Sequence, residues 1–289
     1  NIIGITTVGG NSNVENCTVN TLKILEFMKV NNIPVYKGEQ KPLYKELKTL
    51  ECVFGESGMA GADDLPFPKL KEENIKAKEF IKDIFSKNNN IEICATAPMT
   101  NIAKAFLEKP KIAKNIKEIT IMGGCPFPEP IRGEMGNIFI NNKGEKAEYN
   151  CWTDPEAFDI VINSEIKQIN LIGLNITRDV LYNYLYDKKL KEINTILSNR
   201  VAKILSTIGE EDKIDYNNQK AFMNDPVRAM HDVIAMAYII DKSIFKSEDL
   251  PIKVELKNED KKGQTFVNQY GKNINVILDI DKNKFFDLF

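Results

Sequence analysis

The fold is decided by the stretch Ile91-Glu92-Ile93-Cys94-Ala95-Thr96-Ala97-Pro98-Met99-Thr100-Asn101. The short β-branched apolar run from Ile91 to Ala95 predicts a buried strand, and a proline-containing turn then leads into a segment of helical period. Thr100 and Asn101 can cap a helix that carries Ile102 and Phe106 on one face. The stretch therefore predicts a strand, a turn and a helix in succession.

The same alternation of strand and helix recurs along the chain. Further buried strands are predicted at Ile2 to Val8, Ile119 to Met122 and Ile169 to Leu174. Helices are predicted after Asn13, after Lys71 and from Asp154-Pro155-Glu156 onward. This order is typical of an α/β protein with an open, mostly parallel sheet flanked by helices.

The end of the chain follows a different pattern. Ile252, Val254 and Leu256 alternate with polar residues, a turn follows at Glu259-Asp260-Lys261-Lys262-Gly263, and further strand-like stretches lie around Phe266 and at Val276 to Ile280. We expect a small antiparallel C-terminal appendage. Because no repeat and no linker rich in Gly, Pro or Ser interrupts the chain, a single domain over residues 1–289 is the simplest interpretation.

Composition excludes several classes of partner. A chain of 289 residues with 43% hydrophobic content can bury an ordinary core. The net charge of −2 provides no basic surplus for nucleic acid or an acidic membrane surface. The longest apolar run, Val233 to Ile240, is far shorter than the roughly 18 residues of a membrane span. The 5 scattered cysteines favour a reducing compartment, so we expect a cytoplasmic protein.

Ligands of open α/β sheets bind outside the carboxyl ends of the strands, so the turns after the strands are the candidate sites. In Gly9-Gly10-Asn11, two glycines let the backbone bend closely around a ligand and Asn11 offers an amide. On this motif alone, a plain strand-to-helix turn is the favoured interpretation. In the next such turn, a Thr96 carbonyl left unpaired would suit a hard cation. Capping by Thr100 or Asn101 is the alternative there, but it leaves Thr96 unexplained.

A third turn, Gly123-Gly124, follows Met122 and opens a long irregular stretch that contains Gly136-Asn137. The stretch ends in Ala147-Glu148-Tyr149-Asn150. Glu148 and Asn150 are two residues apart, so an extended backbone would direct a carboxylate and an amide to the same side. Together they could bind vicinal hydroxyls; a solvated polar edge is the alternative.

The chain contains a single histidine, His231. A helix that starts at Pro226 would place His231 on one face with Val227, Ile234 and Tyr238. A lone histidine on such an apolar face is either a buried core residue or a catalyst. Because Asp232 follows directly, a proton donor and a carboxylate would enter one site together.

These residues, taken as a set, resemble the inosine-uridine-preferring nucleoside hydrolase family. The similarity rests on six motifs in the family's order: Gly4-Ile5-Thr6-Thr7-Val8-Gly9-Gly10-Asn11, Gly55-Glu56-Ser57-Gly58-Met59, Ala95-Thr96-Ala97-Pro98-Met99-Thr100-Asn101-Ile102-Ala103, Ile121-Met122-Gly123-Gly124, Ala147-Glu148-Tyr149-Asn150 with Asp154-Pro155-Glu156-Ala157, and His231-Asp232. The resemblance implies a nucleoside hydrolase-like open α/β enzyme, a homodimer or homotetramer, that hydrolyses the N-glycosidic bond of a ribonucleoside with one bound Ca²⁺.

The resemblance also implies a role for each matching residue. Asp232 would be a carboxylate ligand and Thr96 a main-chain carbonyl ligand of the Ca²⁺. His231 would protonate the departing base through a transition state of oxocarbenium character. Met122 would lie against the sugar, and the ribose hydroxyls would be bound by Asn11, Asn137, Glu148 and Asn150.

Two departures from the family pattern stand beside these matches. The Asp-x-Asp-x-x-x-Asp-Asp run of the family's first strand would lie upstream of Ile2, and Phe54 stands where many members have His. We therefore expect a nucleoside hydrolase whose N-terminal strand and helix are missing from this sequence. A non-catalytic nucleoside-binding relative is the alternative. An α/β enzyme of the phosphate- or dinucleotide-binding kind is a weaker third reading, because neither Gly-rich signature is present.

Overall fold

The computed structural model describes residues 1–127, 138–139, 146–207 and 228–288, which form two compact units. One unit comprises Asn1–Gln40, Leu47–Ala77 and Leu181–Ala229, and the other comprises Lys41–Glu46, Lys78–Val180 and Met230–Phe289. The single-domain interpretation stays a prediction. Within the described ranges, no helix has the length and apolar character needed to cross a membrane.

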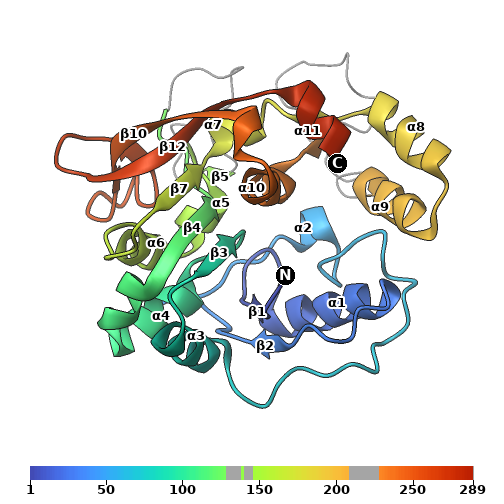
Figure 1. The fold of residues 1–289 in the computed structure, drawn as a ribbon, viewed down its shortest axis with the longest axis horizontal. Coiled ribbons are helices and arrows are strands. Elements are labelled where there is room, and N and C mark those ends of the chain that lie inside the picture. Colours follow the sequence, from blue (N-terminus) through green and yellow to red (C-terminus); the bar gives the residue numbers. More distant parts are fainter. Residues whose placement is uncertain (128–137, 140–145, 208–227, 289) are drawn as a thin grey trace. The chain divides into compact units, whose positions relative to one another are not determined.

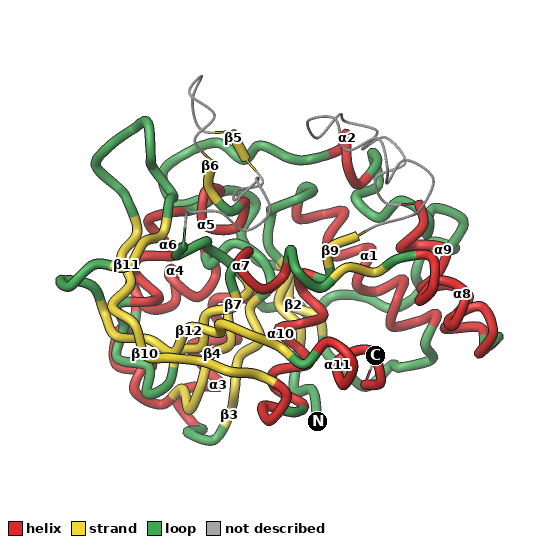
Figure 2. Tube along the Cα trace, turned by 90° about the horizontal axis from the view of Figure 1, so that it is seen from above, coloured by secondary structure: helices red, strands yellow, loops and turns green. Residues whose placement is uncertain are grey.

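The second unit is built on a six-stranded sheet in the order β11-β10-β12-β7-β4-β3 (Figures 1 and 2). The four strands β3, β4, β7 and β12 run parallel to one another. Strand β10 is antiparallel to both of its neighbours, β12 and β11. The strands are β3 (Ile91–Ala95), β4 (Ile116–Met122), β7 (Ile169–Ile172), β10 (Phe245–Val254), β11 (Thr265–Val267) and β12 (Lys272–Ile280). A two-stranded antiparallel ribbon, β5 (Ile138–Phe139) with β6 (Lys146–Ala147), belongs to the same unit.

Helices cover both faces of this sheet (Figure 1). One face is apolar, and its side chains join a single buried core with those of α3 (Ala77–Lys87), α4 (Thr100–Glu108) and α6 (Pro155–Ile162). The strand residues of this face are Ile119, Ile121, Ile169, Leu171, Ile274 and Val276. Burial of such side chains contributes about 1.5–3 kcal/mol each, so this face supplies much of the unit's stability.

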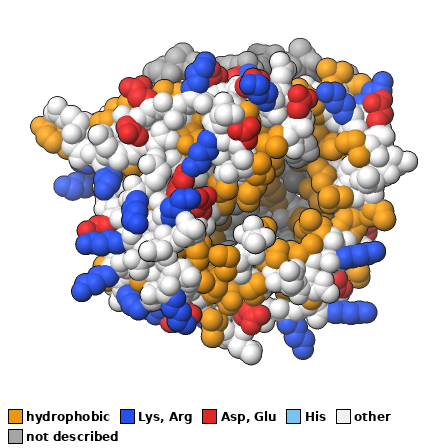
Figure 3. Space-filling model, in the orientation of Figure 1, with side chains coloured by type: hydrophobic (Ala, Val, Ile, Leu, Met, Phe, Trp, Pro, Cys, Tyr) orange, Lys and Arg blue, Asp and Glu red, His pale blue; other side chains and the backbone are white. Residues whose placement is uncertain are grey.

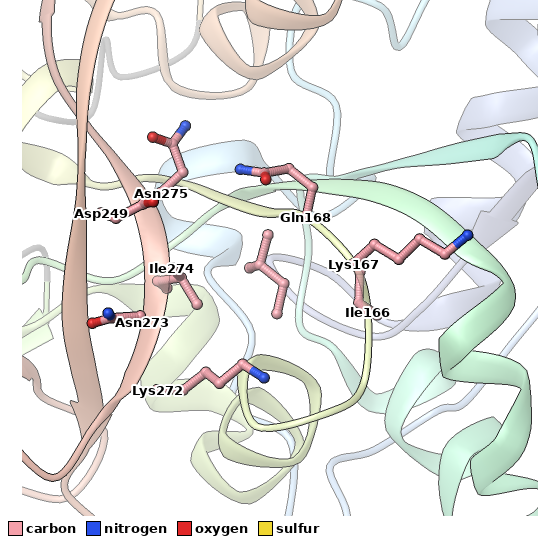
Figure 4. A pocket seen from close by; sticks show the side chains of 9 residues that line it. Ile166, Lys167, Gln168, Asp249, Lys272, Asn273, Ile274 and Asn275 are labelled. Carbon is pink, nitrogen blue, oxygen red and sulfur yellow. The ribbon is translucent and has the colours of Figure 1, made fainter.

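The opposite face carries polar residues under α10 (His231–Ile240). Asn170 of β7 is fully buried there, and its Oδ1 accepts hydrogen bonds from Asn275 Nδ2 (2.9 Å) and Gln168 Nε2 (3.1 Å). Its Nδ2 donates to the Glu118 carboxylate and to Thr120 Oγ1 (3.3 Å). In Figure 4, the amide groups of Gln168 and Asn275 point toward each other beside a small hollow. Asn170 is therefore the centre of a buried polar network.

Two groups that flank the end of α10 join this network. The Tyr238 hydroxyl accepts a hydrogen bond from Asn275 Nδ2 (3.0 Å) and donates to Asn170 Oδ1 (3.4 Å). Lys242, in the 3-10 helix η3 (Lys242–Ile244), pairs with Glu118 Oε2 at 2.7 Å. Because polar partners must meet in register, the network fixes how α10 lies on the sheet.

The remaining helices of this unit are short. They are η1 (Pro110–Asn115), α5 (Tyr149–Thr153), α7 (Leu174–Thr177) and α11 (Lys282–Leu288). Surface charges of both signs are intermixed on the face shown in Figure 3. Exposed pairs such as Lys87 with Asp83 contribute little stability each.

The first unit contains a parallel pair of strands, β1 (Ile5–Thr7) and β2 (Val35–Lys37). Helix α1 (Val14–Phe27) packs on them through a core of Leu22, Leu25 and Val35. The Asn13 side chain caps α1 by accepting from Asn16 N (2.9 Å). The other elements are α2 (Glu51–Phe54), β8 (Leu181–Tyr182), α8 (Tyr184–Ile193), α9 (Ile196–Thr207) and β9 (Arg228–Ala229).

The open, mostly parallel α/β sheet is confirmed, with local corrections. The antiparallel C-terminal strands form as expected, but β12 pairs in parallel with β7, so they extend the main sheet rather than form a separate appendage. Asp154 caps α6 through Ala157 N (3.2 Å). Thr100 and Asn101, predicted caps, are instead the first residues of α4, because the Thr100 hydroxyl donates to Asp154 Oδ2 (2.6 Å).

We expect Asn170→Ala to lower the free energy of unfolding by about 2 kcal/mol or more, because it leaves several buried polar groups without partners. Asn273→Ala, at an exposed position near the start of β12, is the matched control and should change stability by less than about 0.5 kcal/mol. Urea unfolding measures both. Equal losses for the two variants would contradict a central role for Asn170.

Candidate active site

Strands β3, β4 and β7 are parallel, so their carboxyl ends lie along one edge of the sheet. Thr96 follows β3, the pair Gly123-Gly124 follows β4, and Gly173 follows β7. Gly124 has φ +69°, and a Cβ there would lie 2.8 Å from Thr265 Oγ1, so only glycine fits this turn. The Gly124 carbonyl accepts Leu174 N (3.0 Å), which connects the turn after β4 to α7.

Glu148 connects the end of β4 to helix α5. It is the N-cap of α5, and its Oε1 accepts Asn150 N at 2.8 Å. Its Oε2 accepts both Cys151 N and Gly124 N at 2.9 Å. The side chain is 2% exposed, and this burial raises the pKa of Glu148 to about 7 although the N–H donors oppose the shift. The Glu148 carboxylate thus holds the turn after β4 against the first turn of α5.

Asn150 lies between the ends of β3 and β4. Its Nδ2 is 3.1 Å from the Met122 carbonyl, 3.4 Å from Met122 Sδ and 3.4 Å from the Thr96 carbonyl. The Thr96 carbonyl, expected to be unpaired, therefore accepts one long hydrogen bond and keeps a second lone pair. Thr96, Met122, Glu148 and Asn150 are brought together at one edge of the sheet.

The prediction that an extended backbone directs Glu148 and Asn150 to the same side is wrong about the backbone. It assumed an extended backbone, but Glu148 caps α5 and Asn150 lies within that helix. The two side chains nevertheless reach the same strand end, because Glu148 binds Gly124 N while Asn150 binds the Met122 carbonyl. A helical turn, not strand alternation, places them together.

His231 is the first residue of α10, not a residue of its second turn as a start at Pro226 would require. Residues 228 and 229 pair with β8 instead, and Pro226 lies outside the described residues. The ring is half-buried, and its Nδ1 lies 2.7 Å from the Thr177 hydroxyl. Burial and then the positive charge of Arg178 lower the pKa of His231 to about 4, so the imidazole is neutral at pH 7.

Asp232 lies in the first turn of α10, where the helix N-terminus favours a carboxylate. Its side chain is accessible to solvent, yet the surrounding protein and the charge of Glu148 raise the pKa of Asp232 to about 7. The influence of Glu148 on Asp232 places both carboxylates in one electrostatic environment. His231 and Asp232 both lie in the first turn of α10.

The structure does not test two of the predicted ribose-binding residues. Asn11 belongs to the first unit, where it is exposed and its carbonyl accepts Leu50 N (2.8 Å). Asn137 lies outside the described residues. The sequence analysis did not identify Thr177 as a contact of His231. No pattern in the sequence marks a threonine at the end of a four-residue helix as such a contact. The Gly123-Gly124 pair was the feature of the sequence that indicated the turn to which Glu148 binds.

A Ca²⁺ ion takes 6–8 oxygen ligands. The residues predicted to bind it provide the Thr96 carbonyl and the Asp232 carboxylate. In the part of the chain that the structure describes, no group of three or more His, Cys, Asp or Glu side chains could hold a metal ion. The described residues alone therefore do not fit a complete Ca²⁺ site.

Comparison with known proteins identifies the family. The model of the inosine-uridine preferring nucleoside hydrolase family matches residues 1–287. The chain belongs to this family. Among relatives of this nucleoside hydrolase, the pyrimidine-specific ribonucleoside hydrolase RihA of Shewanella sp. strain ANA-3 is 30% identical, over 99% of this chain and 86% of the relative. The inosine-uridine preferring nucleoside hydrolase of Leishmania major is 28% identical, over 92% of this chain and 79% of the relative.

Solved structures support the fold of this nucleoside hydrolase. The purine-preferring ribonucleoside hydrolase from Gardnerella vaginalis superimposes with a TM-score of 0.85 at 24% identity, covering 99% of this chain and 88% of that one. A plant nucleoside hydrolase gives the same TM-score over 100% of this chain and 89% of its own. The family that the six motifs indicated is thus confirmed, and so is the α/β architecture.

We expect Glu148→Gln to lower the free energy of unfolding by about 1–3 kcal/mol, because the amide NH₂ cannot accept a hydrogen bond from the backbone N–H it would face. Glu165→Gln, at an exposed position, is the control and should be nearly neutral. Urea unfolding at pH 7 compares the two. A neutral Glu148→Gln variant would show that the three N–H contacts do not hold this turn.

Proposed function

We propose that this chain hydrolyses the N-glycosidic bond of ribonucleosides and releases ribose and a free base. The match of the family model along residues 1–287 carries the proposal. The arrangement of Met122, Glu148 and Asn150 at the carboxyl edge of the sheet supports it, because ligands of open α/β sheets bind there. The base is left open between purine and pyrimidine, since the relatives' names include both specificities.

In the proposed reaction, a water adds to the anomeric carbon of the ribose while the bond to the base nitrogen breaks. The base takes the electron pair of that bond, and the sugar passes through a transition state of oxocarbenium character. The attacking water loses one proton and the departing base gains one, so the products are ribose and the neutral base. Asn150 offers an amide to the ribose hydroxyls, and Met122 would lie against the sugar. Further ribose contacts are proposed for Glu148, Asn11 and Asn137.

His231 is proposed to act on the departing base. A neutral imidazole can donate a hydrogen bond from its Nε2–H to the base nitrogen as negative charge develops there. A hydrogen bond to the negative charge that develops on the base is worth roughly 10²–10³-fold in rate. The contact with Thr177 occupies Nδ1, so Nε2 is the nitrogen that remains for the substrate.

The family resemblance also implies Ca²⁺ and a homodimer or homotetramer, and both stay predictions. Asp232 and the Thr96 carbonyl are the two ligands proposed for the ion, and they need further oxygen donors to complete its shell. A nucleoside-binding relative without turnover stays the second candidate function. Chelation therefore belongs in the test of activity.

We expect release of free base from at least one of inosine, uridine, cytidine and adenosine, measured by chromatography. Asp232→Ala should lower kcat/KM by about 100-fold or more, because it removes a carboxylate from the site. Asp249→Ala, an exposed carboxylate on β10, is the matched control and should leave activity unchanged. Loss of activity in EGTA and its return with Ca²⁺ would support the metal prediction.

The two candidate functions give different results in this assay. Saturable binding of a nucleoside in calorimetry, without release of base from any of the four, would favour the non-catalytic relative. Equal activity of Asp232→Ala and the parent chain would exclude Asp232 from the reaction.

A further inference from the structure

We propose that Thr177 is a positioning residue for His231: its hydroxyl donates a hydrogen bond to Nδ1 and thereby keeps the ring proton on Nε2. This inference rests on the proposed function, in which Nε2–H faces the departing base. Thr177 does not itself contact the substrate. It acts by selecting one of the two neutral forms of the imidazole and by fixing the ring orientation.

Thr177 is held rigidly where this contact is made. It is the last residue of α7, is 0% exposed, and its own N–H donates to the Gly173 carbonyl (3.2 Å). Gly173 follows β7 directly, so the hydroxyl is fixed relative to the carboxyl edge of the sheet. Its Oγ1 lies 2.7 Å from His231 Nδ1, a normal hydrogen-bond length.

The direction of this hydrogen bond follows from what each atom can do. If Nδ1 carried the proton, it would donate to Oγ1, and the buried hydroxyl hydrogen would have no acceptor among the described residues. If Nε2 carries the proton, the hydroxyl donates to Nδ1 and both groups are satisfied. An unmade buried hydrogen bond is costly enough to favour the second form by roughly 10-fold or more.

The chain offers a matched pair of buried threonines for the test. Thr177→Val keeps the shape and removes the hydroxyl, whereas Thr177→Ser keeps the hydroxyl. Thr153 is 1% exposed at the end of α5, and its hydroxyl has no hydrogen-bond partner among the described residues, so Thr153→Val is the control. Because His231 is the only histidine, the imidazole ¹⁵N signals need no further assignment.

The first experiment is the ¹⁵N spectrum of the parent chain at pH 7. We expect Nδ1 to resonate as an unprotonated nitrogen and Nε2 as a protonated one. Both signals should move toward the values of a tautomer mixture in Thr177→Val and stay in place in Thr177→Ser and Thr153→Val. A parent spectrum with protonated Nδ1 would overturn the proposal, whether or not the chain hydrolyses nucleosides.

The second experiment compares a nucleoside with 4-nitrophenyl riboside, whose leaving group needs no proton. We expect Thr177→Val to lower kcat for the nucleoside about 10-fold, with KM within about twofold, and to change the activated riboside by less than about twofold. Thr177→Ser should restore most of kcat, and Thr177→Val should add little loss in a His231→Ala background.

Two outcomes of these kinetics would overturn the role of Thr177. Equal losses on both substrates would indicate a structural role only, and a failure of Thr177→Ser to restore activity would show that the hydroxyl is not the important group. A parent chain inactive on every riboside would instead contradict the proposed function, while the ¹⁵N spectrum would still test the bond to His231.

Discussion

The site depends on one buried carboxylate. Glu148 accepts hydrogen bonds from the backbone N–H groups of Gly124, Asn150 and Cys151, and so joins the turn after β4 to the first turn of α5. Burying a carboxylate is costly unless its oxygens are paired, and charge-assisted bonds to three N–H groups offset part of that cost. Glu148 is therefore the side chain that joins the left-handed Gly124 turn to the start of α5. Asn150 is placed between the ends of β3 and β4 as a result.

A second constraint places His231. The sheet of this unit is apolar on the face under α4 and α6, but it carries the network of Asn170 on the face under α10. Apolar packing tolerates small slips, whereas a buried polar network has only one register in which its members are satisfied. Tyr238 and Lys242 therefore fix the end of α10, and the bond between Thr177 and His231 fixes its beginning.

The sequence predicted those features that depend on interactions between residues close together in the chain. The strand Ile91–Ala95 and the helix that opens at Asp154-Pro155-Glu156 follow from neighbouring residues, and both are confirmed. The start of α10 was predicted five residues too early because residues 228 and 229 pair with β8, which lies far away in the sequence. The helix caps at Thr100 and Asn101 failed for a similar reason, since Thr100 donates to Asp154 instead. The contacts of Asn170 and Thr177 join distant segments and have no periodic signature.

The central claim is that the carboxyl ends of β3, β4 and β7 form one ribose-binding edge next to His231. A crystal structure of the chain with a nucleoside analogue joined by an uncleavable carbon–carbon bond tests it most directly. The account predicts ribose hydroxyls within hydrogen-bond distance of Asn150, the sugar against Met122, and a base nitrogen facing His231 Nε2. An analogue bound elsewhere, with this edge of the sheet untouched, would contradict it.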